Sequence, residues 1–166
     1  MANSIKITSN NLKDTQKIAE ILADFYIENN GGLICLYGDI GSGKTALTRF
    51  IAKRTGVVEK VTSPSFVILN EYHSGKIPLY HFDFYRLEKE GVSSMIDEIE
   101  TYCEQPDTLT IVEWAEFSDN RLPPKRLNLN IKYIDEDTRA LELTCEEAAL
   151  IKALKERFKN YEYTGV

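Results

Sequence analysis

Eight consecutive residues that follow a short apolar run have the types and spacing of a phosphate-binding loop. Gly38, Gly43, Lys44 and Thr45 satisfy the pattern GxxxxGK[ST]. Glycine lets the backbone curl so that N–H groups point at phosphate oxygens. The lysine brings positive charge to the β- and γ-phosphates, and the threonine hydroxyl can bind magnesium. We assign ATP binding to the whole loop: Gly38, Asp39, Ile40, Gly41, Ser42, Gly43, Lys44 and Thr45.

A loop of this kind works with an acidic residue on the magnesium side, at the end of another strand. The apolar run 109–112 ends in Glu113. Glu113 is therefore predicted to bind Mg²⁺ together with Thr45, directly or through water. Asp83 is a second candidate, which could orient or deprotonate the attacking water. The predicted catalytic residues are Asp83, Glu113 and Lys44.

The residues around these acids leave several interpretations open. His81 is interpreted as a core or surface histidine rather than a catalytic one. Arg86 could contact phosphate or pair with a neighbouring acid. Trp114 and the nearby aromatic residues are expected to pack rather than to stack on a base.

Regular elements must hold this loop. Leu33–Tyr37 is a continuous apolar run, which is typical of a strand buried on both faces. A helix is expected from about Lys44 to Thr55, with Gly56 as its C-terminal cap. The dipole of that helix directs positive charge at the loop.

The remaining segments alternate between strand and helix patterns. Strands are predicted at Ser4–Thr8, Phe66–Tyr72, Ile77–Tyr85 and Leu109–Glu113, and helices at the segment up to Glu28, Met95–Cys103 and Cys145–Tyr161. A hairpin is predicted at Leu127–Ile134 and Arg139–Thr144. The fold class is therefore α/β and P-loop NTPase-like, with a mostly parallel central sheet flanked by helices and a late antiparallel hairpin. The 166-residue length predicts a single domain over 1–166.

Composition restricts the possible partners. The net charge of −6 argues against a whole-surface affinity for nucleic acid or an anionic membrane. We find neither a secretory signal pattern nor a run of the ~20 apolar residues that a membrane span needs. A cytoplasmic location without membrane contact is expected.

Four motifs in this order resemble the TsaE (YjeE) family of bacterial P-loop ATPases. The phosphate-binding loop is followed by TSPSF at 62–66, HFDFYRL at 81–87 and VEWAE at 112–116. The second and third of these later motifs are far more specific than the loop alone. The resemblance extends from about Asn10 to Arg139.

The resemblance implies a role in making threonylcarbamoyladenosine next to the anticodon of tRNAs that read codons beginning with A. The family member docks on a TsaD–TsaB pair, which carries out the transfer, and hydrolyses ATP. The resemblance implies an indirect association of this protein with tRNA.

The resemblance also assigns roles to individual positions. Lys44 and Thr45 match the phosphate and magnesium positions, Glu113 the second magnesium-side carboxylate, and Asp83 an acid needed for ATPase activity. Residues 62–66 match a switch-like loop near the γ-phosphate. Two further matches near the nucleotide are Thr15 and Arg139.

The chain departs from the family pattern at a few positions. Ser42 stands where Ala is usual, and Ser65 replaces a Thr but keeps a hydroxyl for a switch contact. The region Gly91–Asp107 fits the family pattern poorly, so the sequence does not identify a partner-docking surface in that region.

Three other functions remain as alternatives. A P-loop kinase of a small molecule or nucleoside needs an arginine-rich lid, and no arginine cluster follows the loop helix. A GTP switch needs an Asn-Lys-x-Asp segment, which the sequence lacks. The acids Asp83 and Glu113 argue against a module that binds nucleotide without hydrolysis.

Overall fold

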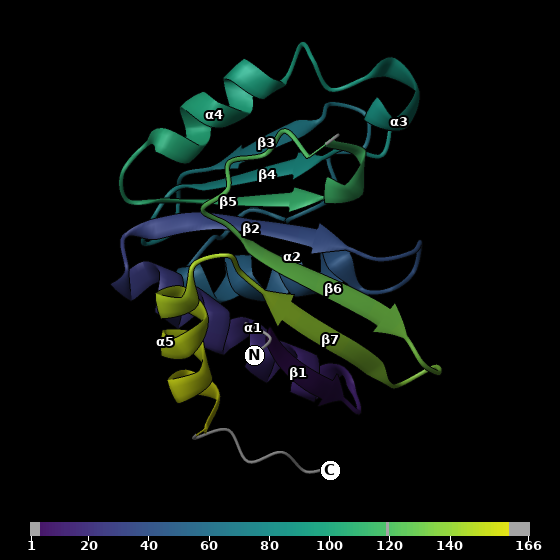
Figure 1. Cartoon of the computed structure of the whole chain (residues 1–166), viewed down its shortest axis with the longest axis vertical. Coiled ribbons are helices and arrows are strands. Elements are labelled where there is room, and N and C mark those ends of the chain that lie inside the picture. The colour runs from purple at the N-terminus through teal and green to yellow at the C-terminus, as the bar shows by residue number, and fades with distance from the viewer. Residues whose placement is uncertain (1–3, 119, 160–166) are drawn as a thin grey trace.

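The structure, a computed structural model, describes residues 4–118 and 120–159. Its strands form one mixed sheet in the order β1-β7-β6-β2-β5-β4-β3 (Figure 1). The pairings β6–β2, β2–β5 and β5–β4 are parallel, and the outer pairings are antiparallel. The strand bounds are β1 Ser4–Ser9, β2 Gly31–Tyr37, β3 Leu69–Tyr72, β4 Leu79–Asp83, β5 Thr108–Glu113, β6 Leu127–Tyr133 and β7 Arg139–Thr144.

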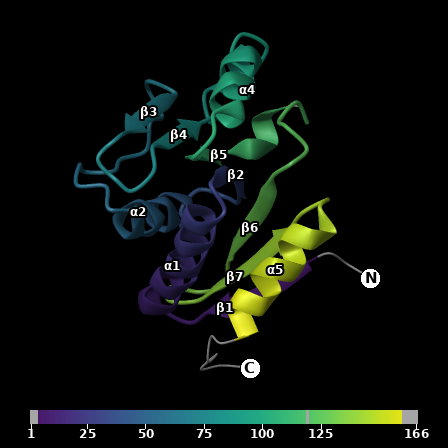
Figure 2. The same ribbon diagram turned by 90° about the vertical axis from the view of Figure 1, so that its left-hand side faces the viewer.

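Helices cover both faces of the sheet. Their bounds are α1 Leu12–Glu28, α2 Lys44–Thr55, α3 Leu87–Glu90, α4 Ile96–Glu104 and α5 Ala148–Lys159, with a 3₁₀ turn at Ala115–Ser118. Helices α1, α2 and α5 pack on one face and α4 on the other, as Figures 1 and 2 show. Successive β2 residues alternate between the two cores: Ile34 and Leu36 face α1 and α2, while Leu33 and Cys35 face α4.

Local signals place the two helices that carry site residues. The side chain of Asn11 accepts a hydrogen bond from the Asp14 N–H at 3.0 Å, and Asp14 accepts one from the Asn10 N–H at 3.0 Å. This reciprocal cap starts α1. Helix α2 ends at Gly56, which takes the left-handed conformation with φ 95°.

The α/β fold class is confirmed, with parallel strands at the centre of the sheet and the late hairpin at β6 and β7. Two predicted strands are too long. Residues 66–68 turn instead, because the Val67 and Ile68 N–H groups bond the Pro64 carbonyl. Residues 84–85 leave β4, since the Phe84 N–H crosses to the Glu113 carbonyl.

The terminal helix also differs from the prediction. It begins at Ala148 rather than Cys145, and the predicted end at Tyr161 lies outside the described residues. The short helix α3 and the 3₁₀ turn were not predicted, because each is a single turn without an apolar period. In the part of the chain that the structure describes, no helix is long and apolar enough to cross a membrane.

We predict that Gly31→Ala destabilises the protein much more than Gly56→Ala. Both glycines have positive φ, at 85° and 95°. That strain costs alanine about 1–2 kcal/mol. A methyl group on Gly31 would also lie 1.8 Å from the Thr108 carbonyl oxygen, whereas on Gly56 it would have ordinary contacts. The clash adds about 1–3 kcal/mol. Urea unfolding measures both losses; equal losses would show that the β2–β5 approach does not restrict Gly31.

Candidate nucleotide site

The phosphate-binding loop connects the end of β2 to the start of α2. Gly43, which precedes the helix, has φ 113°. A methyl group on Gly38 would lie 2.4 Å from the Ile131 carbonyl oxygen, so the loop packs closely on β6. The loop and the first turn of α2 line a cavity of about 660 Å³. Free N–H groups at a helix N-terminus favour an anion there.

Lys44 is the first residue of α2, at the end of the loop. Its ammonium donates to the carbonyl oxygens of Gly38 and Asp39, and it lies 3.8 Å from the ring centroid of Trp114. Burial lowers the pKa of Lys44, and nearby carboxylates oppose this shift, Glu116 most strongly. The lysine is thus held in place by the loop that it would serve.

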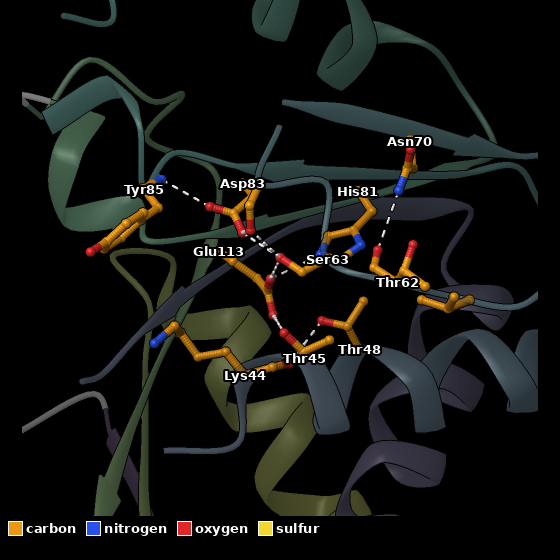
Figure 3. Close-up of polar contacts among 12 residues, drawn as sticks. Lys44, Thr45, Thr48, Thr62, Ser63, Asn70, His81, Asp83, Tyr85 and Glu113 are labelled. Carbon is orange, nitrogen blue, oxygen red and sulfur yellow. Dashed lines mark hydrogen bonds and ion pairs between the residues drawn. The ribbon is translucent and has the colours of Figure 1, made fainter. Parts of the chain in front are cut away.

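Thr45 and the predicted acids meet at the edge of the same cavity (Figure 3). The Thr45 hydroxyl donates to Glu113 Oε1 at 2.8 Å. Asp83 and Glu113 end the neighbouring parallel strands β4 and β5 and are register partners. Only 2% of Asp83 and 1% of Glu113 is exposed. The parallel pairing therefore brings together three site residues that lie far apart in the sequence.

Residues 62–66, the switch segment, close over these acids. The Ser63 hydroxyl donates to Asp83 Oδ2 at 2.5 Å and lies 3.5 Å from Glu113 Oε2. The Ser65 hydroxyl lies 3.2 Å from Asp83 Oδ2. The backbone N–H of Tyr85 donates to the other Asp83 oxygen at 2.9 Å. Both oxygens of Asp83 are therefore hydrogen-bonded.

The donor set is made of oxygens. Among the described residues, no three His, Cys, Asp or Glu side chains cluster as a metal-binding group. Thr45 and Glu113 fit Mg²⁺ in its usual arrangement, in which one or two protein ligands act together with substrate phosphates.

Arg86 lines the same cavity from the segment after β4. Its guanidinium donates to the Phe66 carbonyl at 2.8 Å and pairs with Glu90 at 3.2 Å. Of the two alternatives from the sequence, the structure shows the pairing with an acid. It also shows a bond to the switch segment that the sequence did not indicate.

A smaller cavity of about 270 Å³ lies on the other side of the loop. It shares Ser42 and Gly43 with the first cavity, and both Thr15 and Arg139 line it. The Arg139 Nε donates to the Ser42 carbonyl at 2.9 Å, and the guanidinium lies over the Tyr133 ring. Thr15 and Arg139, the two positions that the resemblance assigned near the nucleotide, thus both line a cavity next to the loop.

Three residues to which the sequence analysis gave no individual contact in this site lie next to these groups. Ser63 contacts both acids, and the hydroxyl-rich TSPS run was its signal. Burial raises the pKa of the Glu116 carboxyl group, and the positive charge of Lys44 opposes this rise. A hydrogen bond with the Gly38 backbone also links Glu116 to the loop. His81 lies 3.3 Å from Glu113, and its place two residues before Asp83 put it on the same side of the strand.

The chain is similar to known proteins of one family. The family model for "Threonylcarbamoyl adenosine biosynthesis protein TsaE" matches residues 9–141. The tRNA threonylcarbamoyladenosine biosynthesis protein TsaE of Bacillus subtilis (strain 168) is 36% identical, over 82% of this chain and 89% of that protein. The protein of the same name from Nostoc sp. is 38% identical, over 69% of this chain and 70% of that protein.

A solved structure shows the same fold. The crystal structure of Bacillus subtilis YdiB superposes with a TM-score of 0.78 at 30% identity, covering 98% of this chain and 99% of that one. The likeness therefore includes the sheet, the loop and the helices on both faces. The resemblance noted in the sequence is confirmed: this chain belongs to the TsaE family.

Proposed function

We propose that this protein is an Mg²⁺-dependent ATPase required for threonylcarbamoylation of the adenosine next to the anticodon, acting on a TsaD–TsaB complex. One observation carries the proposal: Thr45 of the loop helix bonds Glu113 at 2.8 Å, with Asp83 beside it at the edge of the cavity. The names of its relatives support the pathway.

The two cavities suggest how ATP would lie. The phosphates would occupy the larger cavity, held by Lys44 and the backbone N–H groups of the loop and α2. The adenosine would extend across Ser42 and Gly43 into the smaller cavity, between Thr15 and Arg139. Thr45 and Glu113 would hold Mg²⁺, which supplies positive charge to neutralise the phosphates when bound.

Hydrolysis needs an ordered water and stabilisation of the charge on the transferring phosphoryl group. Asp83 is buried next to Glu113 and can accept a hydrogen bond from that water. Arg86 is engaged with Phe66 and Glu90. Turnover of the protein alone should therefore be slow, with an ordering contact supplied by the partner.

The charge of the chain fits a protein partner better than direct binding of tRNA. At a net charge of −6, phosphate contacts over the whole surface are unfavourable. Contact with tRNA would then pass through the TsaD–TsaB pair, and this role would place the protein in the cytoplasm.

The test is ATP hydrolysis by the purified protein, alone and with TsaD, TsaB and tRNA. The expected result is slow hydrolysis alone that rises with the partners, together with multiple-turnover formation of the modified base. A rate of ATP hydrolysis that does not change when these partners are added would overturn the tRNA role. Phosphate transfer to a small molecule or nucleoside would instead identify a kinase.

Asp83→Asn should keep nucleotide binding but lower hydrolysis by about 10²-fold or more, because it removes a group that accepts a proton or orients water. Equilibrium binding and single-turnover hydrolysis separate the two effects. Asp97→Asn, at an exposed acid of α4, is the matched control and should match the wild-type protein. Unchanged hydrolysis in Asp83→Asn would remove Asp83 from the mechanism.

Nucleotide binding should change the fluorescence of Trp114, the single tryptophan of the chain. The Lys44 ammonium lies 3.8 Å from its ring centroid, and phosphates compete for that charge. Lys44→Ala should alter the emission without ligand and abolish the response to ATP. A full response in Lys44→Ala would show that the phosphates bind without this lysine.

A further inference from the structure

A buried histidine lies directly behind the magnesium-side carboxylate. His81 is on β4, and its side chain is 0% exposed. Alternation along the strand places it on the same side as Asp83. Its Nε2 lies 3.3 Å from Glu113 Oε2. Figure 3 shows the ring beside Ser63, between β4 and the first turns of α2.

The hydrogen bonding of this imidazole is incomplete. Within residues 4–118 and 120–159, neither ring nitrogen has an aligned hydrogen-bond partner. The 3.3 Å contact with Glu113 is close enough for an ion pair but is not aligned as a hydrogen bond. Buried polar groups are nearly always paired, and an unpaired one costs stability. Packing alone therefore does not explain a histidine here.

Glu113 has a matching gap in its contacts. Its Oε1 accepts the Thr45 hydroxyl at 2.8 Å. Its Oε2 has the Ser63 hydroxyl only at 3.5 Å, at the limit for a hydrogen bond. His81 Nε2 is nearer to Oε2 than this hydroxyl is. With both side chains at most 1% exposed, bulk water does not replace this donor.

We propose that His81 is a positioning residue for Glu113. Its Nε2–H donates to Glu113 Oε2 and fixes the carboxylate with Oε1 toward Thr45. The proposal rests on the proposed function, in which Glu113 and Thr45 hold Mg²⁺. Carboxylates that bind metals are themselves hydrogen-bonded by such outer groups. These bonds are often long or misaligned without ligand and tighten in the complex, as the 3.3 Å distance allows.

The experiment measures how Mg²⁺ strengthens the binding of a fluorescent ATP analogue, with EDTA as the metal-free reference. His81→Leu removes the donor but keeps an apolar side chain of similar size. His81→Gln keeps an N–H at a comparable reach. His73→Leu makes the same change at an exposed histidine before β4 and is the matched control.

In His81→Leu, the Mg²⁺ concentration for half of the affinity gain should rise about 10-fold or more. Metal-free binding should stay unchanged. His81→Gln should retain most of the wild-type response, and His73→Leu all of it. Thermal unfolding without ligand checks the fold. If His81→Leu is unfolded, His81→Asn, with a shorter reach, gives the same comparison against His81→Gln.

Three results would overturn the proposal. A folded His81→Leu with the wild-type Mg²⁺ response would show that Glu113 needs no such donor. Equal losses in His81→Leu and His81→Gln would show a packing role only. A wild-type protein whose nucleotide affinity does not respond to Mg²⁺ would also remove the metal from the proposed function, whereas the first two results leave that function intact.

Discussion

The contact between Thr45 and Glu113 is the interaction on which the site depends. It joins the first turn of α2 to the end of β5, across 68 residues of sequence. It can form only because β2 and β5 run parallel and adjacent, so that the loop after β2 and the carboxyl end of β5 meet at one edge. A hydrogen bond to a buried charge contributes about 1.5–3 kcal/mol.

Two buried carboxylates side by side create a second constraint. Like charges at the ends of β4 and β5 repel, and burial removes the water that would screen them. Hydroxyl groups of the protein stabilise both acids by hydrogen bonds. Ser63 and Ser65 bond Asp83, while Thr45 bonds Glu113. These bonds join the switch segment to the acids.

The remaining strands and helices surround the site that Thr45 and Glu113 form. Strands β6, β7 and β1 extend the sheet and bring Arg139 against the loop at Ser42. The segment 91–107, which we interpreted from the sequence as a poor fit to the family pattern, includes α4, and α4 packs Ile96 and Ile99 into the core on the opposite face. This segment therefore lies on the face of the sheet opposite to the loop helix α2.

The sequence alone was sufficient for the parts of the protein that short segments determine. The loop, α2 and its end at Gly56 follow from glycine dihedrals and local spacing, which need no distant contact. The buried strand β2 follows from its apolar run. Glu113 and Asp83 were already candidates as acidic residues that could serve the loop, and the family motifs gave them the same roles. Their meeting also requires parallel neighbours.

Only the tertiary structure decided which side chains surround the acids. Strand register and core packing place Ser63 between Asp83 and Glu113, and direct His81 at Glu113 rather than at solvent. The same packing decides that Arg139 reaches Ser42 across 97 residues. Such contacts depend on distances between elements, which a linear pattern does not encode. The sequence therefore determined the chemistry of the loop, and the fold determined the environment in which that chemistry takes place.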